Sequence, residues 1–277
     1  MIVDLVSPWS AAVEATDSPR ARDAFRRRHG QLLELLRRAR APLFDTMPLA
    51  MDIDALRPLA RRAADPALQQ QIRDALARAA QLGADHCRSV VLIAGDGRGD
   101  ATEPIPWPDA DAVLFLDRIE DDSRLIPALA RAVAALTRWG AADSHTAVSH
   151  DVAHGWDRWQ SARDVPLREW IYTEGVGLQL AQALRPDLPP HELLGVNQVA
   201  FGRLRQREKV FRALLTADLD RRGIGLLLRW LTPNAPTGPR TVGNVVLPPM
   251  AGQYLAWRML AERVTRTGLR DAIRMAA

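Results

Sequence analysis

The chain has 277 residues and only one cysteine, and this shortage excludes two classes of protein. With Cys87 alone, neither an intramolecular disulfide nor a cysteine-rich zinc site can form. Cys87 follows His86, so a Cys/His nucleophile pair is conceivable. A small residue just before a strand is the simpler interpretation.

Long apolar runs are also missing, and none approaches the roughly 20 residues that cross a membrane. The opening letters "MIVDLVSPWS" lack the basic segment and the long apolar core of a signal peptide. We therefore expect a soluble, cytoplasmic protein that has no membrane partner.

Lysine is almost absent, since Lys209 is the only one and arginine supplies the rest of the basic side chains. The formal net charge is only +4, because acidic residues are spread through the chain. The densest basic segments, "FRRRHG" and "LLRRAR", come without an aromatic motif on which bases could stack. This balance of charge argues against nucleic acid as a partner.

What is present is an ordinary composition for a folded domain, with 47% hydrophobic and 25% charged residues. Two apolar runs rich in β-branched residues predict buried strands, Ser89 to Gly95 and Ala112 to Ile119. The Gly- and Pro-rich letters between them predict a loop. A second Pro/Gly loop near the C-terminus has room for a short strand, Val242 to Leu247.

Most of the remaining chain predicts helices, with apolar residues at helical spacing from 18 to 83 and again from Asp122 onward. The segments "HTAVSHDVAHGWDRWQSARD" and "ELLGVNQVAFGRLRQREKVFRALLTADLDRRG" are both read as helix. Helices, a small sheet and then helices again predict a helix-rich α+β fold. We expect an N-terminal helical region, 1–85, and a sheet-containing domain, 86–277, that together form one compact unit.

One acid stands in an unusual place for a soluble helix. In "LREWIYTEGVGLQLA", Glu174 falls within the apolar stripe that includes Ile171 and Leu178. A carboxylate on a buried stripe must be paired, metal-bound or protonated, unless it reaches solvent at the edge of the stripe. Gly175 and Gly177 follow at once, and such small residues either admit another backbone or leave room for a ligand.

The letters "HDVAH" suggest a metal site of a different kind. His150 and His154 are four residues apart, so their imidazoles leave a helix on the same side, as two zinc ligands must. Asp151 lies between them, one methylene shorter than the glutamate of the His-Glu-x-x-His motif. Two solvated histidines on a helix would show the same spacing.

The predicted elements follow one another as strand, loop, the strand "AVLFLDRI", an amphipathic helix and a helix with "WIYTEGVGLQLA". This order resembles that of a bacterial family of predicted zinc-dependent proteases. Near the C-terminus, Gly252 and Tyr254 in "PPMAGQYLAWRML" are similar to a Gly/Tyr-rich helix start of that family. The resemblance covers roughly residues 90–277. It implies a zincin-like fold with gluzincin-type ligands, in which "EGVG" would carry the third ligand, Glu174.

The chain departs from that family at the other ligands. The resemblance places the His-Glu-x-x-His positions on the segment from Arg131 to Ala135, which reads Arg-Ala-Val-Ala-Ala. Both histidines and the general base are therefore missing, and "HDVAH" comes one helix too late to replace them in register. Since guanidinium groups pair well with carboxylates, we expect Arg131 to take the former zinc position and to pair with Glu174.

The favoured interpretation is a degenerate zinc-metallopeptidase-like protein without peptidase activity or a metal cofactor. Its former active-site cleft would bind a peptide or a small ligand. The alternative is a zinc-dependent hydrolase with a relocated site, in which His150, His154 and Glu174 hold zinc and Asp151 acts as the base. A third possibility is an enzyme without metal that reuses Arg131, Glu174 and Tyr254 as its polar groups.

Overall fold

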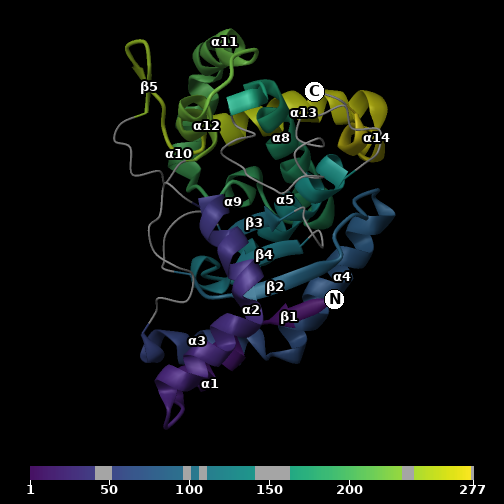
Figure 1. The fold of residues 1–277 in the computed structure, drawn as a ribbon. Helices are drawn as coiled ribbons and strands as arrows, with labels where there is room; N and C mark the ends of the chain where they lie inside the picture. The colour runs from purple at the N-terminus through teal and green to yellow at the C-terminus, as the bar shows by residue number, and fades with distance from the viewer. Residues whose placement is uncertain (41–51, 96–100, 106–110, 141–162, 233–239, 276–277) are drawn as a thin grey trace.

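The computed structural model describes residues 1–40, 52–95, 101–105, 111–140, 163–232 and 240–275. A four-stranded mixed sheet stands at its centre (Figure 1). The strands are β1 (Ile2–Asp4), β2 (Ser89–Ile93), β3 (Thr102–Ile105) and β4 (Asp111–Phe115), in the order β1-β2-β4-β3. The first three strands in this order are parallel, and β3 runs antiparallel at the edge beside β4.

The two central strands are those that the apolar runs predict. β2 is buried along its whole length, as expected of a strand covered on both faces, and Val91 pairs with Val113 of β4. β4 is shorter than predicted, because the chain turns into the 3-10 helix η1 (Leu116–Arg118) after Phe115. Asp117 holds this turn, since its carboxylate accepts a hydrogen bond from the backbone of Gly95 at 2.7 Å.

Both edge strands differ from the prediction. The loop expected between the central strands contains β3, whose Pro104 reads as a breaker but is tolerated where a strand has a neighbour on one side only. At the other edge, Ile2 of β1 pairs with Val90. The N-terminal region, 1–85, therefore contributes a strand to the sheet in addition to its helices.

The structure confirms the helices that the spacing of apolar residues predicts between residues 18 and 83. The helices of the N-terminal region are α1 (Val6–Glu14), α2 (Ser18–Arg40), α3 (Ile53–Ala63) and α4 (Pro66–Gln81). Asp52 and Asp65 cap the starts of α3 and α4 with their side chains. Helix α1 packs between α2 and α3 on the lower side of the sheet in Figure 1, and the upper end of α2 reaches β3.

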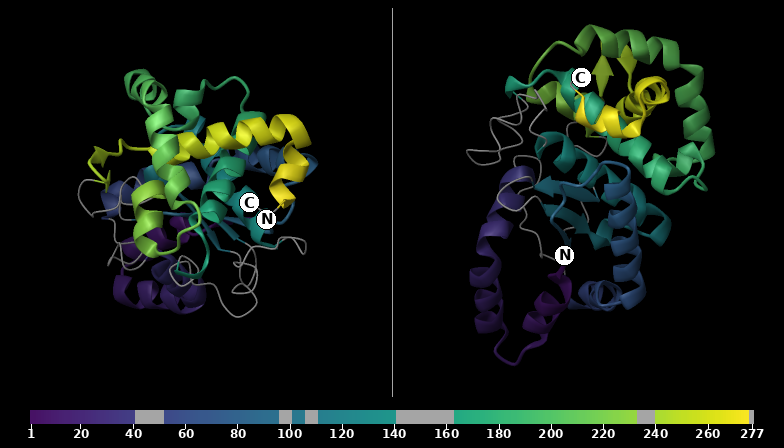
Figure 2. Two further views of the ribbon diagram at one scale, coloured as in Figure 1. Left: turned by 90° about the horizontal axis from the view of Figure 1, so that it is seen from above. Right: turned by 90° about the vertical axis from the view of Figure 1, so that its right-hand side faces the viewer.

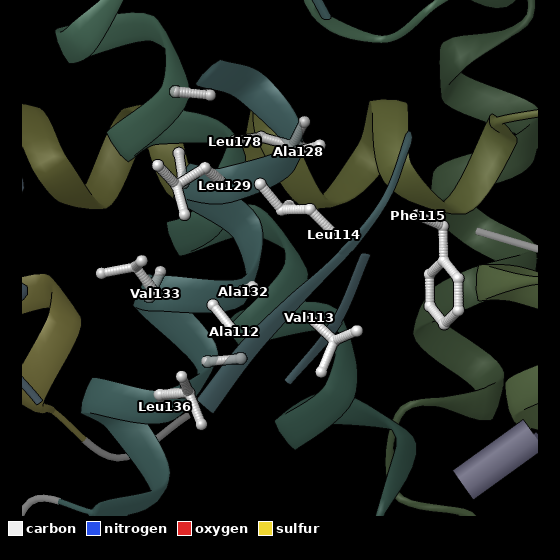
Figure 3. Packing of buried hydrophobic residues seen from close by; sticks show 14 of the residues in the cluster. Ala112, Val113, Leu114, Phe115, Ala128, Leu129, Ala132, Val133, Leu136 and Leu178 are labelled. Atoms are coloured by element: carbon white, nitrogen blue, oxygen red, sulfur yellow. The ribbon is translucent and has the colours of Figure 1, made fainter. Parts of the chain in front are cut away.

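Three long helices are stacked on the other side of the sheet. α5 (Asp122–Gly140) lies on β3 and β4, α8 (Leu167–Leu184) packs on α5, and α13 (Ala251–Thr267) packs on α8. Figure 3 shows the contact of α5 with the sheet, where Ala132 lies near Ala112 of β4 and Leu129 lies near Leu114. These residues belong to one buried apolar cluster that continues into the N-terminal helices.

The remaining described elements lie around α8 and α13 (Figure 2). They are α9 (Pro190–Leu193), α10 (Gln198–Gln206), α11 (Glu208–Asp218), α12 (Ile224–Leu231), β5 (Thr241–Val242), β6 (Val245–Val246) and α14 (Leu269–Arg274). The expected continuous helix is broken into α9, α10 and α11. The first break comes where Gly195 adopts a positive φ of 66° and Asn197 caps a new helix, and the second comes at Arg207. The strand predicted from Val242 to Leu247 is a hairpin that turns at Gly243.

The helix-rich α+β class is confirmed. Within the described parts of the chain, no helix has both the length and the apolar character needed to cross a bilayer. The helix expected around "HDVAH" lies outside the described residues.

Candidate functional site

Arg131 and Glu174 are in contact, as the sequence predicts. Nη2 of Arg131 on α5 lies 2.8 Å from Oε1 of Glu174 on α8, and the two side chains are only 20% and 15% exposed. The sequence leaves open whether Glu174 is paired, metal-bound, protonated or solvated, and the structure shows that it is ion-paired. The geometry is a close charge contact without the predicted bidentate hydrogen bonds, since Oε1 accepts none from a described residue.

The two glycines after Glu174 bring the neighbouring helices close. A Cβ on Gly177 would lie 2.9 Å from the Cα of Arg131, and a Cβ on Gly175 would lie 2.5 Å from the carbonyl oxygen of Ala256 on α13. Of the two roles that the sequence allows for these glycines, the structure shows backbone approach. α8 can therefore pack tightly against α5 on one side and α13 on the other, which fixes the spacing of the ion pair.

The ion pair borders a small cavity of about 60 Å³ between β3, α5, α8 and α12. Arg131, Ala132 and Ala135 reach it from one face of α5, and Glu174 reaches it from α8. These are the positions to which the resemblance assigns the first histidine, the general base, the second histidine and the third ligand. The other residues around the cavity are Thr102, Pro104, Trp139, Trp170, Thr173, Leu227 and Leu231.

Several polar atoms in the cavity wall lack a hydrogen-bond partner among the described residues. They are Oγ1 of Thr102, Nε1 of Trp170 and Oε1 of Glu174, each buried from solvent. Buried polar groups are nearly always hydrogen-bonded, and a cavity of this size can hold a few waters or a small polar group. The site therefore offers a donor and acceptors to a guest.

The described residues around this cavity do not fit a zinc ion. Zinc needs three protein ligands of the imidazole, thiolate or carboxylate kind, and neither a guanidinium nor an alanine is one. No cluster of three or more His, Cys, Asp or Glu side chains suited to a metal occurs in the described part of the chain. His150, Asp151 and His154 lie outside the described residues, so the relocated site stays a prediction.

Tyr254 does not line this cavity and belongs to a separate polar group. Its hydroxyl donates to Oε2 of Glu208 on α11 at 2.6 Å, and its ring packs edge-on against Phe201. Burial and the bond to Glu208 raise the pKa of Tyr254. Its hydroxyl therefore links α13 to α11 and is not part of the Arg131–Glu174 site.

Glu208 gives this polar group a predicted pH dependence. Burial alone would raise the pKa of Glu208, but hydrogen bonds from Tyr254 and Arg212 and the charge of Arg258 outweigh burial and lower it below 4.5.

A carboxyl group whose pKa is lower in the folded state than in the unfolded state stabilises the fold at pH values above its unfolded-state pKa, and this contribution is lost as the pH falls. We expect Glu208→Gln to be less stable than wild type at pH 7, with the difference shrinking below about pH 4.5 in urea unfolding series. The exposed Glu120→Gln is the control, and a difference that grows on acidification would contradict this account.

A second pair between α5 and α8 is not apparent from the sequence pattern. Arg138 is fully buried, and its Nη2 donates to Glu169 at 2.6 Å while its Nε donates to Thr173 at 3.0 Å. Its guanidinium also lies 4.1 Å from the ring centre of Tyr172. The one signal in the sequence is that Arg138 follows Arg131 by seven residues, or two helical turns, on the same face.

Cys87 lacks the properties of a nucleophile. Its thiol donates to the carbonyl of Ser89 at 3.2 Å, and burial raises its pKa to about 11. At pH 8 the fraction of thiolate is then about a hundredfold smaller than it would be for a thiol with the ordinary pKa of 9.0.

We expect iodoacetamide to alkylate Cys87 of the folded protein about a hundredfold more slowly than Cys87 of the urea-unfolded chain, as followed by mass spectrometry. Equal rates in the two states would show that folding does not suppress the thiolate of Cys87, and a faster rate in the folded protein would show that the thiol is activated.

Comparison of the chain with protein-family models, with curated proteins and with solved structures finds no match.

Proposed function

We propose that this chain is a zincin-like protein that lacks the metal site of a zinc peptidase and binds a small polar ligand or the end of a peptide in the Arg131 cavity. The observation that carries the proposal is the convergence of Arg131, Ala132 and Ala135 with Glu174 around one cavity. Positions that the resemblance assigns to metal ligands and base thus meet in space, although none of those on α5 can perform zinc chemistry.

The charge pair and its surroundings support ligand binding over hydrolysis. A peptidase must hold a metal-bound water and a base for it. Here the Arg131 guanidinium lies 2.8 Å from the Glu174 carboxylate and balances its charge. The Thr102 and Trp170 groups nearby are suited to hydrogen-bond a guest. The edge strand β3 supplies Thr102 and Pro104 to the cavity wall, so the site draws on the sheet as well as on the helices.

A second candidate is the zinc-dependent hydrolase in which His150 and His154 join Glu174 as ligands and Asp151 is the base. One observation favours it, namely that Oε1 of Glu174 lines a cavity and accepts no hydrogen bond from a described residue. The neighbouring guanidinium opposes it, because the positive charge of Arg131 would repel a bound cation.

Binding is tested by thermal unfolding of the full chain with a set of free amino acids and dipeptides. A ligand at ten times its Kd stabilises the fold by about 1.4 kcal/mol, which raises Tm by about 3 °C for a chain of this size. We expect such a rise in wild type and in the exposed control Glu120→Gln, and its loss in Glu174→Gln. The proposal fails if no compound raises Tm, or if Glu174→Gln responds like wild type.

The assignment of the former ligand positions has its own test. In Arg131→His/Ala135→His, two imidazoles one helical turn apart would join Glu174 at one cavity. We expect this variant to bind near-stoichiometric zinc and to lose it when Glu174→Gln is added. Failure of the folded double variant to bind zinc would mean that these positions are not arranged as in a gluzincin.

A further inference from the structure

A second, larger cavity of about 600 Å³ lies on another side of α8, between α8, α11 and α13. Its volume falls in the range of sites that hold small organic ligands. It shares no lining residue with the Arg131 cavity. Ile171, Leu219 and Leu260 give it an apolar wall, so a guest there can bury hydrocarbon.

The charges around this cavity are unevenly balanced. Arg168 is paired with Asp220, and Glu262 lies 3.7 Å from Arg212. Arg263 and Arg266, one turn apart on α13, both line the cavity, and neither forms an ion pair within the described parts of the chain. The lining thus has three arginines, Arg168, Arg263 and Arg266, against the two carboxylates of Asp220 and Glu262, and this positive balance favours an anion.

Arg263, one of these arginines, is held beside an aromatic ring. Its guanidinium lies 4.9 Å from the ring centre of Tyr172, which holds it over the cavity without neutralising it. On the same ring lies Arg138, whose charge is balanced by Glu169. An anion bound by Arg263 and Arg266 would therefore be flanked by an aromatic ring and the apolar wall.

We propose that this cavity binds an organic anion that has a single carboxylate or phosphate head and an apolar body. The head pairs with Arg263 and Arg266, as guanidinium groups commonly do with carboxylates and phosphates. The apolar body lies against Ile171, Leu219 and Leu260. The inference is independent of the proposed function, since the two cavities differ in residues, charge and size.

Calorimetric titration of the full chain with sodium decanoate, below its micelle concentration, tests the proposal. We expect binding that weakens at least about tenfold in Arg263→Gln/Arg266→Gln. The control Arg203→Gln/Arg205→Gln removes the same charge from exposed positions of α10 and should change the Kd less than about twofold. Neutral 1-decanol should bind at least about tenfold more weakly than decanoate, and inorganic phosphate more weakly as well.

Three results would overturn the proposal. One is that decanoate does not bind, the second is that decanol binds equally well, and the third is that both double variants weaken binding equally. Vesicles of phosphatidylglycerol separate a free ligand from a lipid surface. If the chain sediments with these vesicles through Arg263 and Arg266 but does not bind decanoate, the cavity is not a small-molecule site and the proposal is wrong.

Discussion

Replacing Arg138 by alanine is expected to lower the free energy of unfolding by about 3–5 kcal/mol, the range measured when one partner of a buried ion pair is removed. The substitution leaves the Glu169 carboxylate, only 13% exposed, without its partner. It also removes a hydrogen bond to Thr173 and one to the backbone carbonyl of Met275, and it opens space beside Tyr172. Urea unfolding followed by circular dichroism measures the loss.

Two further variants separate the charge from the packing. Arg138→Met/Glu169→Gln removes both charges while retaining volume, and it should recover much of the stability lost in Arg138→Ala. Arg57→Ala breaks exposed pairs with Glu14 and Asp54, and its urea midpoint should stay near that of wild type. If Arg138→Ala unfolds at the wild-type midpoint, the buried pair does not hold α5 to α8.

Replacing Gly175 by alanine is expected to destabilise the fold by about 1–3 kcal/mol, as overpacking of a core does. Helix propensity alone predicts a gain of up to about 1 kcal/mol, since glycine is a poor helix former. The new methyl group would lie 2.5 Å from the carbonyl oxygen of Ala256 and 2.8 Å from Leu260, so α13 must move away from α8. The steric cost should exceed the propensity gain, because a backbone atom cannot yield as a flexible side chain can.

Gly202→Ala is the matched control for this prediction. Gly202 also lies within a helix, α10, but a Cβ there would have no atom within 4 Å. We expect this substitution to raise the urea midpoint by the propensity term alone. An increase in both variants would show that the α8–α13 contact is loose enough to admit a methyl group.

The sequence predicts the Arg131–Glu174 contact because two independent arguments meet there. An acid within the apolar stripe of α8 needs a partner, and the resemblance points to Arg131 for a chain that lacks the metal ligands. The cavity that both residues border is not predictable in the same way, since it depends on how closely Gly177 lets α5 approach. Glycine spacing shows where close approach is allowed but not which helix uses it.

Local patterns fail where a neighbour in space decides the structure. Pro104 suggests a loop, yet β3 forms because its edge position needs hydrogen bonds on one side only. β1 has only three residues, Ile2–Asp4, and depends on pairing with β2. The sequence does not single out Arg138, because its partner Glu169 lies on another helix and the seven-residue spacing from Arg131 alone does not show that Arg138 is buried.

The zinc content of the purified, untagged protein, measured by mass spectrometry after zinc has been offered, tests the central claim most directly. An Arg131–Glu174 pair in place of a metal site predicts no stoichiometric zinc in wild type, His154→Ala or Glu174→Ala. Near-stoichiometric zinc in wild type that is lost in both variants would contradict the account. It would show that His154 and Glu174 share a metal, and the chain would then be examined as a hydrolase.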